Sequence, residues 1–328
     1  MNFCAQFIIA MGTLFDLYSG IGGLSLALQP EFKTVAYCEN DPAAVAVLEK
    51  NMRNRRLHKA PIYPDVSKLT ESDLNKLKPS CLSMGFPCQD ISTAKHNAEG
   101  IDGVRSGSVM HVIRLVKDLS FVRLLFLENS PALRTRGLHS LEKALKTSGF
   151  NLCWGLFAAC DVGSPQKRLR WYGIAYREGK DVAALNIPFK KRPWKLEPNI
   201  ERVVPKSDAA VNRLQLLGNA VVPQCARFAF STLCAKWQAG VVERKHACKL
   251  PTIRLIYPSR DVVRKAGWAT PMRAVAGPCV RATHRCNSQL LGNALYSKPT
   301  TVKRPVSVNP LWVEWLQGYP SHYTQRSR

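Results

Sequence analysis

One thiol and one carboxyl group in this chain stand where they could carry out covalent chemistry. Cys88 follows a short apolar run that ends at Phe86, so a strand is predicted to deliver it into a loop, where a cysteine can be a nucleophile. Taken alone this signal is weak, because cysteines are among the most buried residue types. Glu128 and Asn129 end a second apolar run, 121–127. In open α/β sheets the carboxyl ends of adjacent strands form the ligand-binding edge, so the thiol and the carboxyl group are predicted to face one pocket.

A glycine-rich turn upstream indicates a nucleotide or nucleoside site. Residues 13–23 run from an apolar strand through Gly20, Gly22 and Gly23 into a helix-like segment, 24–28. Glycine permits positive φ and lets a ligand approach bare backbone, while the helix N-terminus offers unpaired N–H groups. An ordinary strand-to-helix turn is the alternative, since the dinucleotide fingerprint is imperfect.

Two acidic residues follow the next strands at the spacing that doubly wound sheets use for nucleosides. Glu39 ends an apolar run about 20 residues beyond the glycines, where a carboxylate can meet ribose hydroxyls. Asp65 follows the next predicted strand, where it could meet an adenine amino group or could simply cap a turn. The chain has no Walker-type loop, which favours a cofactor without phosphates, and S-adenosylmethionine fits this description. The predicted fold is α/β with a doubly wound, mostly parallel sheet.

Seven segments, taken in order, resemble the motifs of the DNA (cytosine-5)-methyltransferases. They are FDLYSGIGG at 15–23, END at 39–41, Asp65, PCQDIS at 87–92, ENS at 128–130, QKRLR at 166–170 and GNAVVP at 218–223. The resemblance implies a Rossmann-like methyltransferase fold with S-adenosylmethionine as cofactor and S-adenosylhomocysteine as product. Seven ordered motifs are far more specific than any one of them.

The resemblance also implies the reaction and the residues that carry it. Cys88 would add to C6 of a cytosine flipped out of the duplex, Glu128 would support N3, and C5 would take the methyl group. Residues 103–107 fall where the family has a loop that closes over the base, with glycines as hinges. The implied catalytic residues are Cys88, Glu128, Arg168, Arg170, Gln89 and Ser92; the implied cofactor-binding residues are Phe15, Asp16, Gly20, Gly22, Gly23, Glu39, Asn40, Asp65, Pro87 and Asn219.

The two arginines of the QKRLR segment could also have a purely structural role. Arg168 and Arg170 alternate along 168–174, so they could form the solvated face of an edge strand. The resemblance instead implies that they help to hold the flipped base and order the site.

The charge of the chain indicates a polyanionic partner. It holds 47 Lys and Arg against 23 Asp and Glu, a net charge of +24. Residues 1–100 hold 10 basic and 10 acidic side chains, whereas residues 241–328 hold 15 and 3. We therefore expect double-stranded DNA as the partner. A solubility feature or a disordered arm is the alternative for the tail, although its interleaved aromatic residues, Trp268, Tyr296, Trp312, Trp315 and Tyr319, count against disorder.

The order of the motifs departs from the usual family pattern. Only about 40 residues separate Arg170 from Gly218, too few for a recognition domain, while an LQGYP segment at 316–320 follows the Gly-Asn motif instead of preceding it. This resembles the rearranged order of phage and large-virus enzymes. The predicted division is an N-terminal extension 1–12, a catalytic domain 13–177, a short basic connector 178–210, a completing Gly-Asn motif and helix 211–238, and a basic target-recognition region 239–328.

Composition excludes several other classes of protein. No apolar run of about 18 residues is present, and residues 1–10 lack the basic start of a secretion signal, so we expect no membrane partner and a location in the cytoplasm or at the nucleoid or nucleus. We also expect a monomer. Eleven cysteines without paired spacing indicate a reducing compartment. A zinc site from Cys248, Cys279, His284 and Cys286 is conceivable, but no Cys-x2-Cys pair anchors it, and none is expected.

Three functions compete at this point. The first is an active DNA cytosine-C5 methyltransferase, for example in restriction-modification. The second is an RNA methyltransferase of the transfer-RNA type, against which the long basic tail and the lack of a Cys-Phe-Thr element count. The third is a catalytically silent DNA-binding relative.

Overall fold

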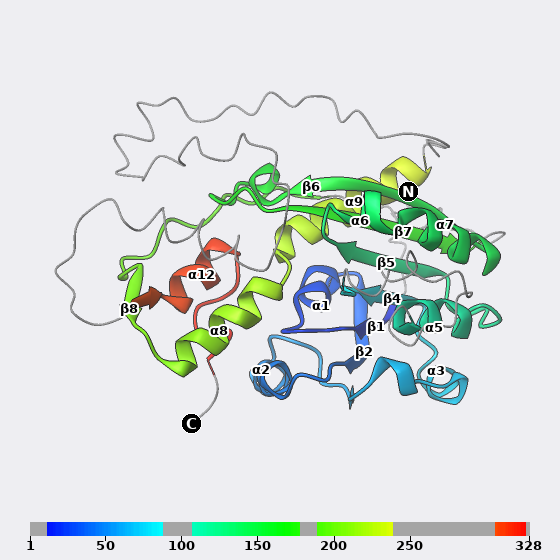
Figure 1. The fold of residues 1–328 in the computed structure, drawn as a ribbon, viewed down its shortest axis with the longest axis horizontal. Coiled ribbons are helices and arrows are strands. Elements are labelled where there is room, and N and C mark those ends of the chain that lie inside the picture. The colour runs from blue at the N-terminus through cyan, green and yellow to red at the C-terminus, as the bar shows by residue number, and fades with distance from the viewer. Residues whose placement is uncertain (1–11, 88–106, 178–188, 239–305, 326–328) are drawn as a thin grey trace, which may run out of the picture.

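A seven-stranded sheet with helices on both faces forms the body of the protein in the computed structural model, which describes residues 12–87, 107–177, 189–238 and 306–325 (Figure 1). The strands of the large sheet are β1 (Gly12–Leu17), β2 (Phe32–Cys38), β3 (Ile62–Tyr63), β4 (Cys81–Met84), β5 (Leu124–Asn129), β6 (Phe150–Ala158) and β7 (Leu169–Arg177), and a small sheet pairs β8 (Val203–Pro205) with β9 (Val306–Val308). The helices are α1 (Gly23–Leu28), α2 (Pro42–Arg53), α3 (Glu71–Leu77), α5 (Gly107–Leu115), α6 (Leu133–Arg136), α7 (Leu138–Thr147), α8 (Asp208–Asn219), α9 (Pro223–Gln238) and α12 (Pro310–Leu316), with 3-10 turns η1 (Val66–Lys68) and η3 (Ala159–Val162).

The large sheet has the order β3-β2-β1-β4-β5-β7-β6. The strands from β3 to β5 run parallel, and β7 pairs antiparallel with both β5 and β6. Every residue of β5 is buried, as expected for a strand covered on both faces. The predicted α/β fold with a doubly wound, mostly parallel sheet is confirmed.

Two apolar cores cover the two faces of the sheet. One contains side chains from α5 and α7, and the other contains side chains from α1 and α9. In the second core the ring of Phe230 packs edge-on against Phe32 and Phe126, with centroids 6.0 and 5.0 Å away. The predicted division placed a helix after the Gly-Asn motif within 211–238, and α9 is that helix. Through Phe230, α9 thus packs against residues of both β2 and β5.

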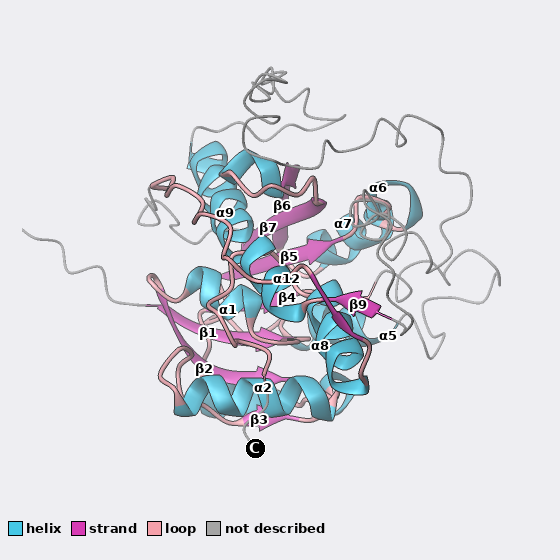
Figure 2. Cartoon of the chain, turned by 90° about the vertical axis from the view of Figure 1, so that its left-hand side faces the viewer, coloured by secondary structure: helices cyan, strands magenta, loops and turns pink. Residues whose placement is uncertain are grey.

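The C-terminal segment folds back onto this body. β9 pairs antiparallel with β8, and α12 packs along α8 (Figure 2). A third apolar core joins α12 to α8 and α2 through Trp312, Leu217 and Val47. This differs from the predicted division, which placed all of 239–328 in a separate recognition region: residues 306–325 pack on the catalytic body because their apolar side chains complete its core. A recognition role for 239–305 stays a prediction.

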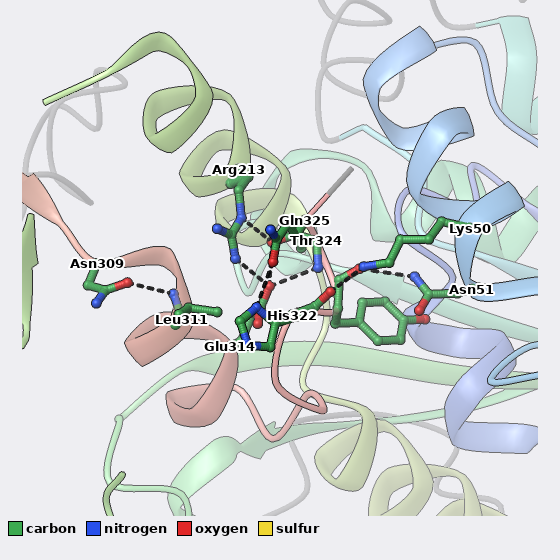
Figure 3. Close-up of polar contacts among 10 residues, drawn as sticks. Lys50, Asn51, Arg213, Asn309, Leu311, Glu314, His322, Thr324 and Gln325 are labelled. Carbon is green, nitrogen blue, oxygen red and sulfur yellow. Dashed lines mark hydrogen bonds and ion pairs between the residues drawn. The ribbon is translucent and has the colours of Figure 1, made fainter. Parts of the chain in front are cut away.

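A buried ion pair fastens α12 to α8 (Figure 3). Glu314 is fully buried, and its Oε1 accepts hydrogen bonds from Arg213 Nη2 (2.9 Å), the backbone N–H of Thr324 (2.8 Å) and the Thr324 hydroxyl (2.5 Å). Arg213 Nε in turn donates to Thr324 Oγ1 at 2.9 Å. Arg213, Glu314 and Thr324 thus form one network that fixes the turn after α12.

The same turn is fastened to α2. The Lys50 ammonium donates to the carbonyl oxygen of His322, and Asn51 Nδ2 donates to that of Tyr323 at 3.1 Å (Figure 3). His322 has φ +61°, a conformation that is costly for a residue with a side chain, so these contacts hold a strained turn. The C-terminal segment is therefore bound to both α2 and α8.

The connector before β8 also packs on the body. Phe189 and Trp194 lie partly buried against the α1–α9 core. The Trp194 ring lies so close to Gly318 that a Cβ placed there would stand 2.9 Å from it, and Gly318 has φ +74°. Only glycine suits that position in the LQGYP segment.

In the part of the chain that the structure describes, no helix is long and apolar enough to cross a bilayer.

Breaking the buried pair tests whether residues 306–325 belong to the folded core. We expect Glu314→Gln to lower the free energy of unfolding by about 3 kcal/mol, because the Arg213 charge loses its buried partner. The measurement is chemical denaturation followed by circular dichroism.

Glu49→Gln is the matched control, since its pair with Arg53 is 4.0 Å long and both side chains are more than half exposed. That change should cost less than about 0.5 kcal/mol. Equal effects of the two substitutions would contradict an integral role for the C-terminal segment.

Candidate active site

Four parallel strands end at one edge of the sheet and bring the predicted motifs together. Their last residues are Leu17, Cys38, Met84 and Asn129, on β1, β2, β4 and β5. The motif loops begin directly after these ends, as the sequence predicted. The edge faces α8 and α12 (Figure 1).

The glycine loop after β1 is held by Glu39 at the end of β2. Glu39 Oε2 accepts from the N–H of Gly20 at 2.6 Å, and Oε1 accepts from the N–H groups of Asn40 (3.0 Å) and Asp41 (2.8 Å). Each carboxylate oxygen has two lone pairs, so both on Oε1 are used and one on Oε2 remains for a ligand hydroxyl. Gly20 has φ +53°, and nothing lies within 4 Å of where its Cβ would be. A nucleoside can approach this open stretch of backbone, so the loop and Glu39 fit the predicted cofactor.

Phe15 and Asp16 differ from their prediction as cofactor contacts. Both side chains are fully buried, because they point into the interior from a central strand. Asp16 accepts from the hydroxyls of Ser83 (2.5 Å) and Ser25 (2.8 Å), which links β1 to β4 and α1 beneath the loop. Burial raises the pKa of Asp16 to about 7, although both serine hydrogen bonds act to lower it. Its position makes it a support for the loop.

Tyr18 connects the loop to the start of α5. It has φ +53°, a strained backbone for a tyrosine, and its hydroxyl donates to Ser108 Oγ at 2.6 Å. A Cβ on Gly85, the residue after β4, would lie 4.0 Å from the Tyr18 carbonyl oxygen. The cofactor loop, the end of β4 and the first turn of α5 therefore meet at this residue.

Asp65 and Asn219 lie at the edge with their predicted roles untested. Asp65 follows β3 and caps η1, accepting from the hydroxyl of Ser67 at 2.7 Å and from its N–H at 2.9 Å. These bonds lower the pKa of Asp65. Asn219 is exposed as the last residue of α8. Contacts of either residue with a cofactor stay predictions.

Glu128 and Arg170 form the charged centre of the edge. Arg170 Nε lies 3.3 Å from Glu128 Oε1, across the pairing of β5 with β7. Burial raises the pKa of Glu128, and the charges of Arg170 and then Arg168 oppose the rise. A Cβ on Gly85 would lie 3.5 Å from Glu128 Oε2, so the carboxyl faces the backbone three residues before Cys88.

Asn129, which the sequence placed at this edge without a role, links two strands at the site. Its Nδ2 donates to the carbonyl oxygen of Phe86 at 3.0 Å, and its Oδ1 accepts from the N–H of Ser130 at 2.7 Å. The amide thus ties the end of β5 to the segment that leads to Cys88. Its place beside Glu128 in the ENS segment was the available signal.

Arg168 turns away from Glu128 and holds the Gly-Asn turn. Its Nη2 donates to the carbonyl oxygens of Gly218 (2.9 Å) and Ala220 (2.6 Å). Burial, together with the neighbouring Arg170, lowers the pKa of Arg168 to about 10. The reading of both arginines as the solvated face of an edge strand is wrong, because β7 lies between β5 and β6.

Several predicted positions lie outside the described residues. Pro87 is exposed at the end of the described segment, and Cys88, Gln89, Ser92 and residues 103–106 follow beyond it. The same holds for the cysteines and the histidine of the conceivable zinc site. Among the residues that are described, no cluster of three or more metal-binding side chains occurs.

The model of the C-5 cytosine-specific DNA methylase family matches residues 12–325. The chain belongs to this family. The match includes the glycine loop, Glu128, strand β7 with Arg170 and the C-terminal segment. It therefore confirms the resemblance predicted from the motifs.

Curated relatives fall in the same family. The Type II methyltransferase M2.BsuMI of Bacillus subtilis (strain 168) is 35% identical over 181 residues, which cover 51% of this chain and 43% of the relative. The tRNA (cytosine(38)-C(5))-methyltransferase of Schizosaccharomyces pombe is 25% identical over 163 residues, covering 49% and 48%. The matched part thus spans less than half the length of these relatives.

Solved structures of this class are also similar to the chain. S. pombe Dnmt2 methyltransferase matches with a TM-score of 0.44 and 24% identity, covering 52% of both chains. A DNA modification methyltransferase encoded within a prophage of E. coli, described as putative, matches with a TM-score of 0.45 and 23% identity, covering 60% and 58%.

The buried Asp16 gives stability a distinctive dependence on pH. The pKa is raised on folding, so the stabilisation is complete below about pH 4 and is lost as the pH rises to about 7. We expect this group to lower the free energy of unfolding by up to about 1.4 kcal/mol per pH unit in that window. The measurement is denaturant unfolding at several pH values from 4 to 8. The decrease in the free energy of unfolding with pH should be present in the parent protein and absent in Asp16→Asn.

Asp73→Asn supplies a control of opposite sign. Hydrogen bonds from Thr70 lower the pKa of Asp73 in the fold, so its contribution is lost as the pH falls. The interpretation of Asp16 is rejected if the two substitutions change the pH profile in the same direction.

Proposed function

We propose that this chain transfers a methyl group from S-adenosylmethionine to C5 of cytosine in double-stranded DNA. The observation that carries the proposal is the buried Glu128 carboxyl, which is paired with Arg170 and faces the backbone that leads to Cys88. Membership of the cytosine-specific DNA methylase family supports the same reaction. The basic charge of the chain supports a nucleic acid as the substrate.

Glu39 and the glycine loop would hold the cofactor. The remaining lone pair on Glu39 Oε2 suits a ribose hydroxyl, and the open backbone at Gly20 admits a nucleoside without a phosphate. When bound there, S-adenosylmethionine supplies an electrophilic methyl group on a sulfonium and leaves as S-adenosylhomocysteine.

The chain's own residues prepare the base to accept that methyl group. The cytosine must leave the duplex stack, because its ring faces are covered by its neighbours. The Cys88 thiolate forms a bond to C6, and electron density moves to C5 and N3. Glu128 shares a proton with N3, a role that burial favours by raising its pKa. After C5 has gained the methyl group it loses its proton to a base, and the C6–S bond breaks to release the thiolate and 5-methylcytosine.

Replacing Cys88 tests the nucleophile. With labelled S-adenosylmethionine and unmethylated duplex DNA, we expect label in 5-methylcytosine from the parent protein and none from Cys88→Ser, since an alcohol is a far weaker nucleophile than a thiolate. Nucleoside digestion identifies the product. The matched control is Cys160→Ser, a partly exposed free cysteine, which should retain activity.

The same assay separates the alternatives. Label on transfer RNA and none on DNA would replace the DNA substrate with RNA. DNA binding without any transfer, from a protein that binds the cofactor, would leave a catalytically silent relative.

Glu128→Gln tests the acid. We expect kcat to fall by about 100-fold or more, because an amide cannot share a proton with N3. Cofactor affinity, measured by calorimetry with S-adenosylhomocysteine, should stay unchanged, as Glu128 and Glu39 lie on different strands. An unchanged kcat would remove Glu128 from the proposed reaction.

A further inference from the structure

The connector before β8 carries an exposed basic run on a fixed backbone. Residues 189–195 read FKKRPWK, and the side chains of Lys190, Lys191, Arg192 and Lys195 are all exposed. No acidic residue interrupts the run. Together these four cations form what we call the connector surface.

Contacts on both sides of the run fix its path. The Phe189 and Phe228 rings pack with centroids 5.0 Å apart. Along the run, the carbonyl oxygen of Arg192 accepts from Gln224 Nε2 at 3.1 Å, and that of Lys195 accepts from Trp315 Nε1 at 2.9 Å. The backbone is therefore anchored while the four charged heads remain in solvent, which is unlike a solvated charge run on a loose tail.

The connector surface lies at the catalytic edge. Trp194 sits against Gly163, where a Cβ would stand 3.8 Å from the Trp194 Cβ. Gly163 belongs to the turn between β6 and β7, and this hairpin reaches the edge where Asn129 ends β5 opposite Trp171. The exposed Lys167 on the same turn extends the positive charge toward Arg168.

Nearby carboxylates are already engaged. Glu197 binds Arg202 through two hydrogen bonds of 2.7 and 2.8 Å and also accepts from Trp312 Nε1 at 2.8 Å. Asp161 Oδ2 accepts from the N–H of Ala158 at 2.8 Å. None of the ion pairs among the described residues includes one of the four cations, so the charge of the connector surface is open to an external partner.

We propose that the connector surface binds the phosphate backbone of duplex DNA beside the target base. The inference rests on the proposed function, and it adds a described, anchored DNA contact to the recognition region predicted at 239–328. From Lys190 to Lys195 the chain spans at most about 18 Å, and each DNA strand places a phosphate about every 3.4 Å along its axis, so several phosphates lie within reach.

The test is the salt dependence of DNA binding by the full chain. The variant Lys190→Gln/Lys191→Gln/Arg192→Gln and the parent protein are titrated with a fluorescent duplex of about 30 base pairs at 50–300 mM NaCl. Each lost phosphate contact lowers the slope of log K against log salt by about 0.9, so we expect the slope to fall by about 2 to 3 and the affinity near 0.1 M salt to fall at least about tenfold. Affinity for S-adenosylhomocysteine and the melting temperature should not change, because the three side chains are exposed.

A variant with the same charge change elsewhere is the matched control. Lys143 and Lys146 are exposed on α7 and Lys117 is exposed after α5, and both helices lie at the far end of the molecule from α12 (Figure 1). Replacement of the three lysines by glutamine should leave the slope unchanged. An equal fall of the slope in both variants would mean that only net charge matters, and it would overturn the proposal that the connector surface binds DNA.

Two further outcomes separate this inference from the proposed function. An unchanged slope in the connector variant of a protein that methylates DNA overturns the inference alone. A parent protein that transfers no methyl group, but whose DNA binding weakens in the connector variant alone, overturns the proposed function and leaves the surface standing. A loss confined to a structured RNA duplex, with DNA binding unaffected, rejects DNA as the partner of this surface.

Discussion

Carbonyl groups of the irregular backbone at the catalytic edge accept hydrogen bonds from side chains that are remote in the sequence, and the arrangement of the site depends on these bonds. The carbonyl of Ile21 in the glycine loop accepts from Tyr323 Oη at 3.0 Å, and that of Val221 in the Gly-Asn turn accepts from Tyr319 Oη at 3.0 Å. Gln317 Nε2 bonds the carbonyl of Leu217 at 2.8 Å. A buried carbonyl without a partner costs about 1–3 kcal/mol, so these bonds hold both turns in place.

The same constraint explains why chain order and spatial order can differ. The LQGYP segment lies against the Gly-Asn turn, although Gln317 and Leu217 are 100 positions apart. Ser164 and Gln166, just before the arginine strand, reach this segment by donating to the carbonyl of Leu316 at 2.9 Å each. What the site requires is the set of contacts, and a segment that returns from a remote part of the chain can supply them.

Much of the edge could be predicted from sequence because parallel strands place their ends together. An apolar run followed by Glu39 or Glu128 is a local pattern with a geometric consequence. The partners of Arg168 could not be predicted, since Gly218 and Ala220 are set by how α8 docks. Whether β7 is central or at an edge depended on β6 pairing beyond it, which alternation of side chains does not reveal. The burial of Asp16 was missed for a related reason, because a loop motif gives no sign of which carboxyl lies beneath it.

Two opposing effects set the pKa of Glu128, and a bound substrate that contacts Arg170 would change their balance. Burial favours the protonated carboxyl, while Arg170 at 3.3 Å favours the carboxylate. A phosphate or base that draws Arg170 away from Glu128 removes the charge that most lowers its pKa, so burial raises the pKa further. Arg168 then supplies the remaining opposing charge, although its Nη2 donates to the carbonyl oxygens of Gly218 and Ala220 and not to Glu128. In the proposed reaction, engagement of Arg170 by the substrate would then raise the pKa of Glu128 further while its proton is shared with N3.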